Sequence, residues 1–294
     1  MPGFNEFMLA VTQLGEETAF LIVALILFWC VDKYKGYYIL SVGFVGILTN
    51  QFLKLWFRVP RPWVLDSNFS ILEQAREAAS GYSFPSGHTQ TAVGTFGGIA
   101  YVFKNRWLRI SCLAVAVLVP FSRMYIGVHT PLDVFVSVLI AIVLIVVMKH
   151  FVLDNFKRNF RYVFTVMLSV GIAFICFVNF YNFPADVDLQ NLASGQLNAC
   201  TLLGSLCGLL IVYVFDEKWL NFSTKAVWWA QVMKVICGLI LVLAVKTGLK
   251  TPLNLLLGES FGRAARYMLV VIVAGILWPL TFRFFEGLGA HKKY

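Results

Sequence analysis

The sequence predicts an all-α polytopic membrane protein, a transmembrane helical bundle of about nine spans. Hydrophobic residues make up 59% of its 294 residues, charged residues make up 13%, and the mean hydropathy is +0.77. A soluble domain has about 45–50% apolar and about 25% charged residues. A chain of this length has too little interior to bury the apolar excess in water. The composition therefore excludes a soluble enzyme, a disordered chain and a disulfide scaffold.

The cysteines and the net charge fit the same class of protein. All six cysteines lie inside or at the ends of apolar stretches, and none belongs to a C-x-x-C pair. We expect them to be small apolar residues of helices rather than metal ligands or disulfides. No nucleic-acid motif is present, so we expect no nucleic-acid partner. The net charge of +9 is then explained by membrane topology.

Nine apolar segments have roughly the length of about 20 residues that a membrane span needs. In chain order they lie near 16–31, 37–57, 88–103, 107–122, 132–153, 162–181, 198–215, 228–247 and 267–282. Residues 5–14 are expected to form a short interfacial helix before the first span. The third and fourth segments are short and contain polar residues, so we expect them to pack among neighbouring helices. The glycine pairs Gly94–Gly98 and Gly204–Gly208 are candidates for close helix contacts.

The distribution of Lys and Arg predicts the orientation in the membrane. The short connection at 149–161 is strongly basic, which places it in the cytoplasm by the positive-inside rule. With nine spans, the N-terminus then lies outside and the C-terminus lies in the cytoplasm. Residues 248–266 are expected to form the last external loop, although this stretch is also basic.

Three polar clusters break the apolar pattern, and all three fall at the same predicted external face. The first ends the second span and runs from Lys54 to Arg61-Pro62. The second, Pro85-Ser86-Gly87-His88, opens the third span, and the third joins the fourth and fifth spans and runs from Ser122-Arg123 to His129 and Asp133. Ionisable residues are rare in membrane helices unless they line a site. Fixed cations and imidazoles gathered at one surface indicate a dianionic substrate, with phosphate as the obvious candidate.

Each cluster contains groups that suit phosphate chemistry. Arg61 and Arg123 can hold phosphate oxygens through bidentate hydrogen bonds, and Lys54 supplies a compact positive charge. Ser86 and Gly87 lie where a helix begins, so their backbone N–H groups can face an anion. Gly87 also lets the backbone approach closely because it has no side chain.

The remaining polar residues suit a covalent reaction at phosphorus. His129 can attack phosphorus if a carboxylate holds its other ring nitrogen, and Asp133 is in reach if a helix begins at Pro131. His88 can then protonate the departing alkoxide. The Arg and Lys residues take over charge stabilisation, so we expect no metal and no cofactor. Structural roles are open as well: Thr130 to Asp133 also forms a good N-terminal helix cap, and the two roles can coexist.

These residues resemble the three-part signature of the type 2 phosphatidic acid phosphatase superfamily. The match consists of Lys54-x6-Arg61-Pro62, Pro85-Ser86-Gly87-His88 and Ser122-Arg123-x5-His129-x3-Asp133, with no departure at a signature position. The resemblance implies that His129 is the nucleophile, Asp133 its partner and His88 the general acid. It also implies phosphate binding by a set of five residues, Lys54, Arg61, Ser86, Gly87 and Arg123.

The resemblance implies a division of the chain as well. Residues 1–181 are expected to be the catalytic core of six helices, and residues 182–294 additional C-terminal transmembrane helices of unknown role. The loop 63–84 is expected to cover the site or to be a solvated external loop, with a short helix at 71–79. Residues 182–294 carry no signature of their own.

The favoured function is an integral-membrane, metal-independent phosphatase that hydrolyses a lipid phosphate monoester or diphosphate at the extracytoplasmic face through a phosphohistidine. Its partners would be the lipid substrate and the bilayer. Nine helices and the run from Arg61 to Asp66 also resemble the glucose-6-phosphatase branch, which acts on a soluble sugar phosphate. A lipid or phosphate binder or transporter that does not hydrolyse is the third alternative.

Overall fold

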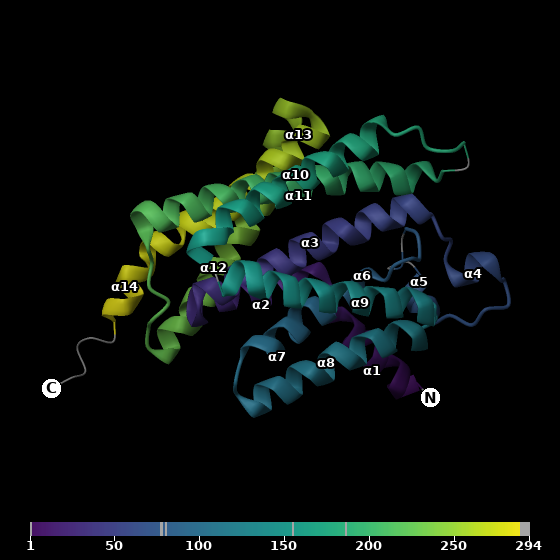
Figure 1. Cartoon of the computed structure of the whole chain (residues 1–294), viewed down its shortest axis with the longest axis horizontal. Coiled ribbons are helices and arrows are strands. Elements are labelled where there is room, and N and C mark those ends of the chain that lie inside the picture. The colour runs from purple at the N-terminus through teal and green to yellow at the C-terminus, as the bar shows by residue number, and fades with distance from the viewer. Residues whose placement is uncertain (1, 77–78, 80, 155, 186, 289–294) are drawn as a thin grey trace. The chain divides into compact units, whose positions relative to one another are not determined.

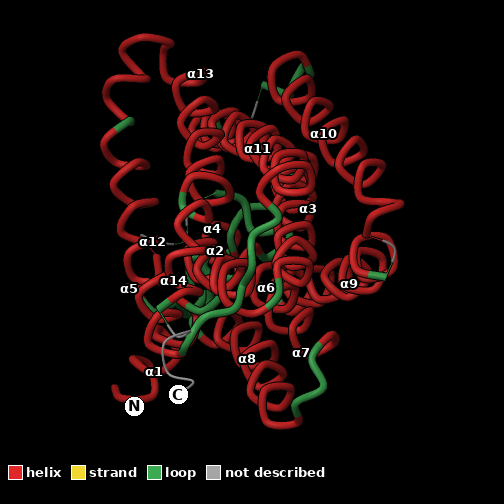
Figure 2. The backbone as a smooth tube through the Cα atoms, turned by 90° about the vertical axis from the view of Figure 1, so that its left-hand side faces the viewer, coloured by secondary structure: helices red, strands yellow, loops and turns green. Residues whose placement is uncertain are grey.

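The computed structural model is a helical protein, in agreement with the predicted fold class (Figure 1). It describes residues 2–76, 79, 81–154, 156–185 and 187–288. Figure 2 shows helices joined by loops, and no strand occurs in the described part of the chain. The helices are α1 (Pro2–Gln13), α2 (Glu17–Ile26), α3 (Lys33–Phe57), α4 (Pro62–Leu65), α5 (Glu73–Arg76), α6 (Gly87–Ala92), α7 (Gly98–Val102), α8 (Arg106–Tyr125), α9 (Pro131–Met148), α10 (Phe156–Phe180), α11 (Leu189–Phe215), α12 (Trp228–Gly248), α13 (Lys250–Ile272) and α14 (Phe282–Gly287).

Short π-helical turns extend several of these helices. They follow α2, α9, α11 and α13, and a fifth, Val93–Gly97, joins α6 to α7. Residues Gly87–Val102 therefore form one continuous helix whose three parts have 6, 5 and 5 residues. This helix is shorter than a span of about 20 residues, as the sequence predicted for the third segment.

The number of membrane spans is close to the prediction. Seven helices are long and apolar enough to cross a membrane, and α1 with α2, bent by 56°, makes an eighth candidate. The short helix Gly87–Val102 corresponds to the remaining predicted segment. Each predicted segment thus coincides with a helix, and the chain is an integral membrane protein with multiple spans.

Two connections differ from the prediction. Residues 248–266 were expected to form a loop, but most of them belong to α13, which is interrupted at Gly258. Gly258 has φ 77° and ψ 171°, a conformation that glycine adopts without steric cost. The predicted helix at 71–79 is limited to the single turn of α5, and Glu77 and Ala78 lie outside the described residues.

Local capping explains where the helices around the polar clusters begin. The Ser86 side chain accepts a hydrogen bond from the Thr89 N–H at the start of α6. Thr130 and Asp133 form a reciprocal capping box at the start of α9, with Pro131 in the first turn. The caps fix the directions in which α6 and α9 leave the polar clusters.

The chain divides into two compact units that interleave along the sequence. Unit 1 comprises Met1–Val23, Tyr38–Asn155 and Asn182–Gly195, and unit 2 comprises Ala24–Tyr37, Phe156–Tyr181 and Gln196–Tyr294. In unit 1, α8 contacts α1, α6 and α9, and α6 also contacts α9. Val11, Ala92 and Val119 form a buried apolar cluster where α1, α6 and α8 meet. All three predicted polar clusters belong to unit 1.

Unit 2 has close helix packing and a buried ion pair of its own. Lys33 Nζ lies 2.9 Å from Asp216 Oδ2 and 3.0 Å from Asn221 Oδ1. Gly204 and Gly208 of α11 face the backbone of α13, at Ala264 and Met268 respectively. The prediction of a close helix contact at this glycine pair is confirmed.

We expect Gly204→Ala to destabilise the protein, because a methyl group at this position would overlap with the Ala264 carbonyl oxygen. Overpacking of this kind costs about 1–3 kcal/mol, which exceeds the gain in helix propensity from Gly to Ala of about 1 kcal/mol. The measurement is the melting temperature of the full chain in detergent. Gly248→Ala is the matched control, since a Cβ at residue 248 meets no atom within 4 Å. An unchanged melting temperature for Gly204→Ala would contradict the packing.

Candidate active site

A cavity of about 430 Å³ in unit 1 brings the predicted polar residues together. Its walls come from α3, from the start of α6, from α8, from the loop before α9 and from the connection between α1 and α2. The lining includes six of the eight predicted site residues: Lys54, Arg61, Gly87, His88, Arg123 and His129. The sequence clusters, which are up to 75 positions apart by residue number (from Lys54 to His129), thus form one site.

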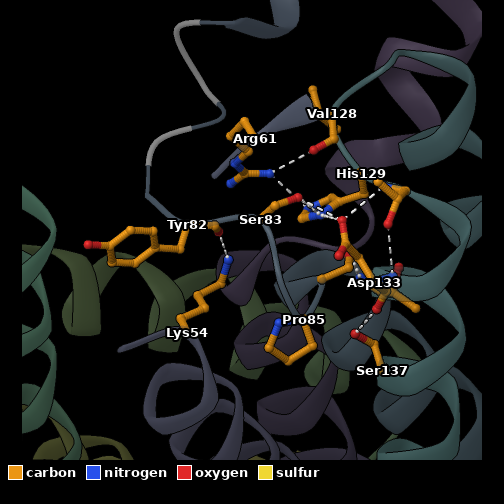
Figure 3. A network of polar contacts seen from close by, with 12 residues as sticks. Lys54, Arg61, Tyr82, Ser83, Pro85, Val128, His129, Asp133 and Ser137 are labelled. Carbon is orange, nitrogen blue, oxygen red and sulfur yellow. Dashed lines mark hydrogen bonds and ion pairs between the residues drawn. The ribbon is translucent and has the colours of Figure 1, made fainter. Parts of the chain in front are cut away.

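His129 lies between the Asp133 carboxylate and the Arg61 guanidinium (Figure 3), and it lines the cavity. Its Nδ1 lies 3.3 Å from Asp133 Oδ2, and its Nε2 lies 3.0 Å from Arg61 Nη1. Because Arg61 can only donate, Nε2 is the acceptor and the proton belongs on Nδ1, facing Asp133. The arrangement leaves the lone pair of Nε2 on the side of the cavity.

Asp133 contacts both His129 and the N-terminal cap of α9. Its Oδ2 accepts hydrogen bonds from the Thr130 N–H at 2.8 Å and from Ser83 Oγ at 2.6 Å. The same oxygen faces His129 Nδ1. The helix-cap role and the histidine contact, which the sequence left open as alternatives, are therefore both present.

Backbone carbonyl groups hold two of the cations in place. Arg61 donates from Nε to Gly81 O at 2.9 Å and from Nη1 to Val128 O at 2.9 Å. Lys54 Nζ donates to Tyr82 O (Figure 3). These acceptors orient the side chains without adding a full negative charge, so the cavity keeps its positive charge for an anionic ligand.

Arg123 is held from α1. Its Nη1 donates to Thr12 Oγ1 at 2.8 Å, and its Nε has no hydrogen-bond partner among the described residues. Arg123 is buried, and its guanidinium interacts electrostatically with the carboxylate of Glu16, in the connection after α1. Residues at the end of α1 thus take part in a site whose signature lies elsewhere in the chain.

The helix start at 86–88 meets the cavity through Gly87 and His88. Ser86 is fully buried, and its Oγ faces the Thr89 N–H, so its hydroxyl serves the helix cap rather than the cavity wall. A Cβ at residue 87 would meet Asn50 Oδ1 at an ordinary 3.5 Å. The protein itself therefore has room for a small side chain at 87. Phosphate binding by Ser86 and Gly87 stays a prediction.

The middle of the loop 63–84 packs against α1 and against the segment between α8 and α9. Ile71 and Leu72 pack with Ala75 against Met8 of α1 and against Ile126 and Val128. The Leu72 N–H also donates to Ile126 O at 3.1 Å. The loop thus packs against the segment that carries His129.

The charges around His129 and its burial lower its basicity. Burial, followed by the positive charges of Arg61, Arg123 and Lys54, holds the pKa of His129 well below its usual value of 6.5. The imidazole is therefore neutral near pH 7, which is the form with a lone pair on Nε2. Among the described residues, no group of three or more His, Cys, Asp or Glu side chains is placed to hold a metal ion.

Several residues of the site were not predicted from the sequence. They are Thr12, Glu16, Glu17, Asn50 and Ser83, which line the cavity or contact its charged side chains. Gly15 explains part of this arrangement, because a Cβ there would lie only 2.8 Å from His88 O. The sequence contains one signal for this part of the site: the pair of acidic residues after Gly15 interrupts an otherwise apolar stretch.

Comparison with known proteins matches most of the chain to one superfamily. Residues 34–157 match the model of the PAP2 superfamily, and residues 200–291 match that of the PAP2 superfamily phosphatase transmembrane extension. Phosphatidylglycerophosphatase B of Bacillus subtilis is 30% identical over 173 residues, which cover 54% of this chain and 80% of that protein. No solved structure matches significantly.

Two further relatives are similar over different lengths. Undecaprenyl-diphosphatase BcrC of Bacillus subtilis is 33% identical over 102 residues, or 35% of this chain and 50% of that protein. Sphingosine-1-phosphate phosphatase 1 of Rattus norvegicus is 24% identical over 274 residues, or 85% of this chain and 61% of that protein. The matched regions thus span only half to about three fifths of these two relatives.

The polytopic helical fold and both family models define a membrane phosphatase. The chain belongs to the PAP2 superfamily, which is the family that its three polar clusters resemble.

We expect His129→Asn to weaken the dependence of stability on acid pH. Because the pKa of His129 in the folded protein lies below 6.5, unfolding takes up a proton at this site as the pH falls below 6.5. This contribution lowers the free energy of unfolding by about 1 kcal/mol between pH 6.5 and pH 5.5. Melting temperatures of the full chain in detergent at pH 7.5 and 5.5 should differ less for the variant. The exposed His150, replaced by Asn, is the control, and an equal loss in His129→Asn and wild type would refute the expectation.

Proposed function

We propose that the protein hydrolyses a lipid phosphate monoester or diphosphate at the extracytoplasmic face of the membrane, through a phosphohistidine on His129. The observation that carries this proposal is the placement of His129, with Nδ1 on Asp133 and Nε2 on the side of the cationic cavity. Simple binding of phosphate does not require a neutral imidazole backed by a carboxylate. A nucleophile at phosphorus does.

The first step forms the P–N bond and breaks the P–O ester bond. In the free protein, Arg61 Nη1 lies 3.0 Å from His129 Nε2. When phosphate binds, Arg61 donates to its oxygens instead, and the lone pair of Nε2 becomes available. Nε2 attacks phosphorus, the ester oxygen leaves with the bonding electrons, and His88, which enters this step in its protonated imidazolium form, gives that oxygen a proton and becomes neutral. Asp133 stabilises the positive charge that develops on the imidazole.

The second step returns the enzyme to its starting state. Neutral His88 takes a proton from water, whose oxygen attacks phosphorus as the P–N bond breaks. The bonding electrons return to Nε2, and inorganic phosphate leaves. Lys54, Arg61 and Arg123 stabilise the charge on the phosphoryl oxygens in both steps, so we propose that the reaction needs neither a metal nor a cofactor.

We further propose that catalysis resides within residues 1–181 and that residues 182–294 contribute no reacting group. All residues that line the cavity belong to the first 129 positions of the chain. Several relatives are named for lipid phosphates or diphosphates, which supports a lipid substrate from the bilayer rather than a soluble sugar phosphate.

Replacing the two histidines should have different effects on the two steps. We expect His129→Ala to release no phosphate from phosphatidate or from p-nitrophenyl phosphate, because no P–N bond can form. His88→Ala should lower phosphatidate hydrolysis about 10²–10⁴-fold, but it should still release one equivalent of p-nitrophenol, since that leaving group needs no proton. The assays use the full chain in detergent with EDTA present.

Three results would contradict the proposal. Turnover by a folded His129→Ala would exclude the phosphohistidine, and a strict requirement for Mg²⁺ would exclude the metal-independent mechanism. A higher kcat/KM for glucose 6-phosphate than for every lipid phosphate tested would exclude the lipid assignment. The melting temperature of each variant checks that it is folded.

The proposed orientation places the site and the N-terminus outside and the C-terminus in the cytoplasm, although residues 289–294 lie outside the described residues. We expect Asn68→Cys, in the exposed part of the loop 63–84, to react with an impermeant maleimide in intact cells. Lys104→Cys, in the exposed connection between α7 and α8, should react only after permeabilisation. The chain without either substitution corrects for its own six cysteines. Labelling of Lys104→Cys alone in intact cells would reverse the orientation.

A further inference from the structure

A buried amide side chain in the wall of the catalytic cavity has no partner in the protein. Gln90 lies on α6 and is 2% exposed. It lines the cavity, and neither its Nε2 nor its Oε1 forms a hydrogen bond within the described part of the chain. Buried polar groups are nearly always paired, because an unpaired one costs free energy. An unpaired amide side chain in the wall of a cavity is therefore suited to a ligand.

The neighbouring helix makes room for this amide and continues the same wall. A Cβ at Gly46 of α3 would lie 2.8 Å from Gln90 Nε2, so glycine at 46 is what allows the amide to pack there. Asn50, one turn further along α3, also lines the cavity and donates to Pro85 O at 3.3 Å. Lys54 follows one turn later. The wall thus changes from neutral amides to cations along α3.

The spacing of this wall matches the atoms next to a phosphate ester. Asn50 and Lys54 are four residues apart on a helix, which corresponds to about 6 Å along its axis. A phosphoryl group bound among the cations therefore leaves the first carbons of its alcohol near the amides. A hydroxyl or amino group on the carbon beside the ester carbon can hydrogen-bond with an amide there.

The acidic residues at the mouth of the cavity also favour a substrate with a hydroxyl or amino group. Glu16 and Glu17 line it from the bend between α1 and α2, and both side chains are exposed. A carboxylate accepts hydrogen bonds from a hydroxyl or ammonium group, and it repels a second phosphate.

We propose, on the basis of the proposed function, that Gln90 is a specificity-determining residue that selects lipid phosphate monoesters with a hydroxyl or amino group on the carbon beside the ester carbon. Such a substrate forms a hydrogen bond with the buried amide of Gln90, whereas a plain alkyl chain leaves the amide without a hydrogen-bond partner. A site that hydrogen-bonds part of its substrate rejects analogues that lack the group far more strongly than an apolar pocket rejects a small change in shape. Isoprenyl diphosphates, with an apolar chain after the phosphate, are disfavoured.

The test compares matched substrates in the same detergent micelles at equal mole fraction. The hydroxyl arm is a 1-acyl-glycerol 3-phosphate, the amino arm is sphinganine 1-phosphate, and the reference is an alkyl monophosphate of equal chain length. We expect wild-type kcat/KM to be at least about tenfold higher for one or both functionalised substrates than for the reference. The arm with the larger ratio identifies the group that Gln90 binds.

Gln90→Met keeps the length of the side chain and removes its hydrogen-bonding groups. We expect this variant to bring the ratio of kcat/KM values close to one, through a loss on the functionalised substrate with little change on the reference. Gly46→Ala keeps the amide of Gln90 but displaces it, so this variant should also lower the ratio of kcat/KM values. It provides a second test if Gln90→Met does not fold. Thr95→Val is the matched control, because Thr95 Oγ1 is also buried and without a partner among the described residues but does not line the cavity. Its ratio should equal that of wild type.

Two outcomes would overturn the inference and leave the proposed function intact. One is a wild-type ratio near one. The other is that Gln90→Met changes kcat/KM equally for all substrates, or not at all, which would show that the amide does not distinguish between them. Absence of hydrolysis of every lipid phosphate by wild type would instead refute the proposed function itself.

Discussion

The carboxylate of Asp133 is the contact on which the rest of the site depends. Its Oδ2 faces three donors, which are the Thr130 N–H, Ser83 Oγ and His129 Nδ1. The backbone carbonyl of Asp133 also accepts from the Ser86 N–H at 3.3 Å. One buried residue therefore starts helix α9, fixes the segment before α6 and orients the imidazole. Because these contacts share a residue, the orientation of the His129 imidazole and the start of both helices are set together.

The cavity combines a strong positive charge with a neutral imidazole. Carbonyl oxygens of Gly81, Tyr82 and Val128 hold the side chains of Arg61 and Lys54 without neutralising them. Burial and, after it, the same cations lower the pKa of His129 and so keep the imidazole neutral. The uncompensated positive charge of the buried cavity thus suits an anionic ligand and also helps to keep His129 unprotonated.

Much of the fold and the polar clusters could be predicted from the sequence because both depend on local patterns. Apolar segments locate the helices, and the spacing from His129 to Asp133 is one helical turn. Ser83, Gln90 and Thr12 could not be assigned in this way, since their roles come from contacts between separate helices. The helical form of residues 250–266 was missed because polar residues there mimic a loop, while Gly258 allows the break within α13.

The family model begins at residue 34, yet part of the cavity wall comes from residues 15–18. The bend between α1 and α2 rests on the backbone of His88 at Gly15 and contributes two carboxylates to the mouth. The three polar clusters and this part of the wall are therefore encoded in different stretches of the chain. A change in the bend between α1 and α2 can thus alter the mouth of the cavity and leave the residues of the three clusters in place.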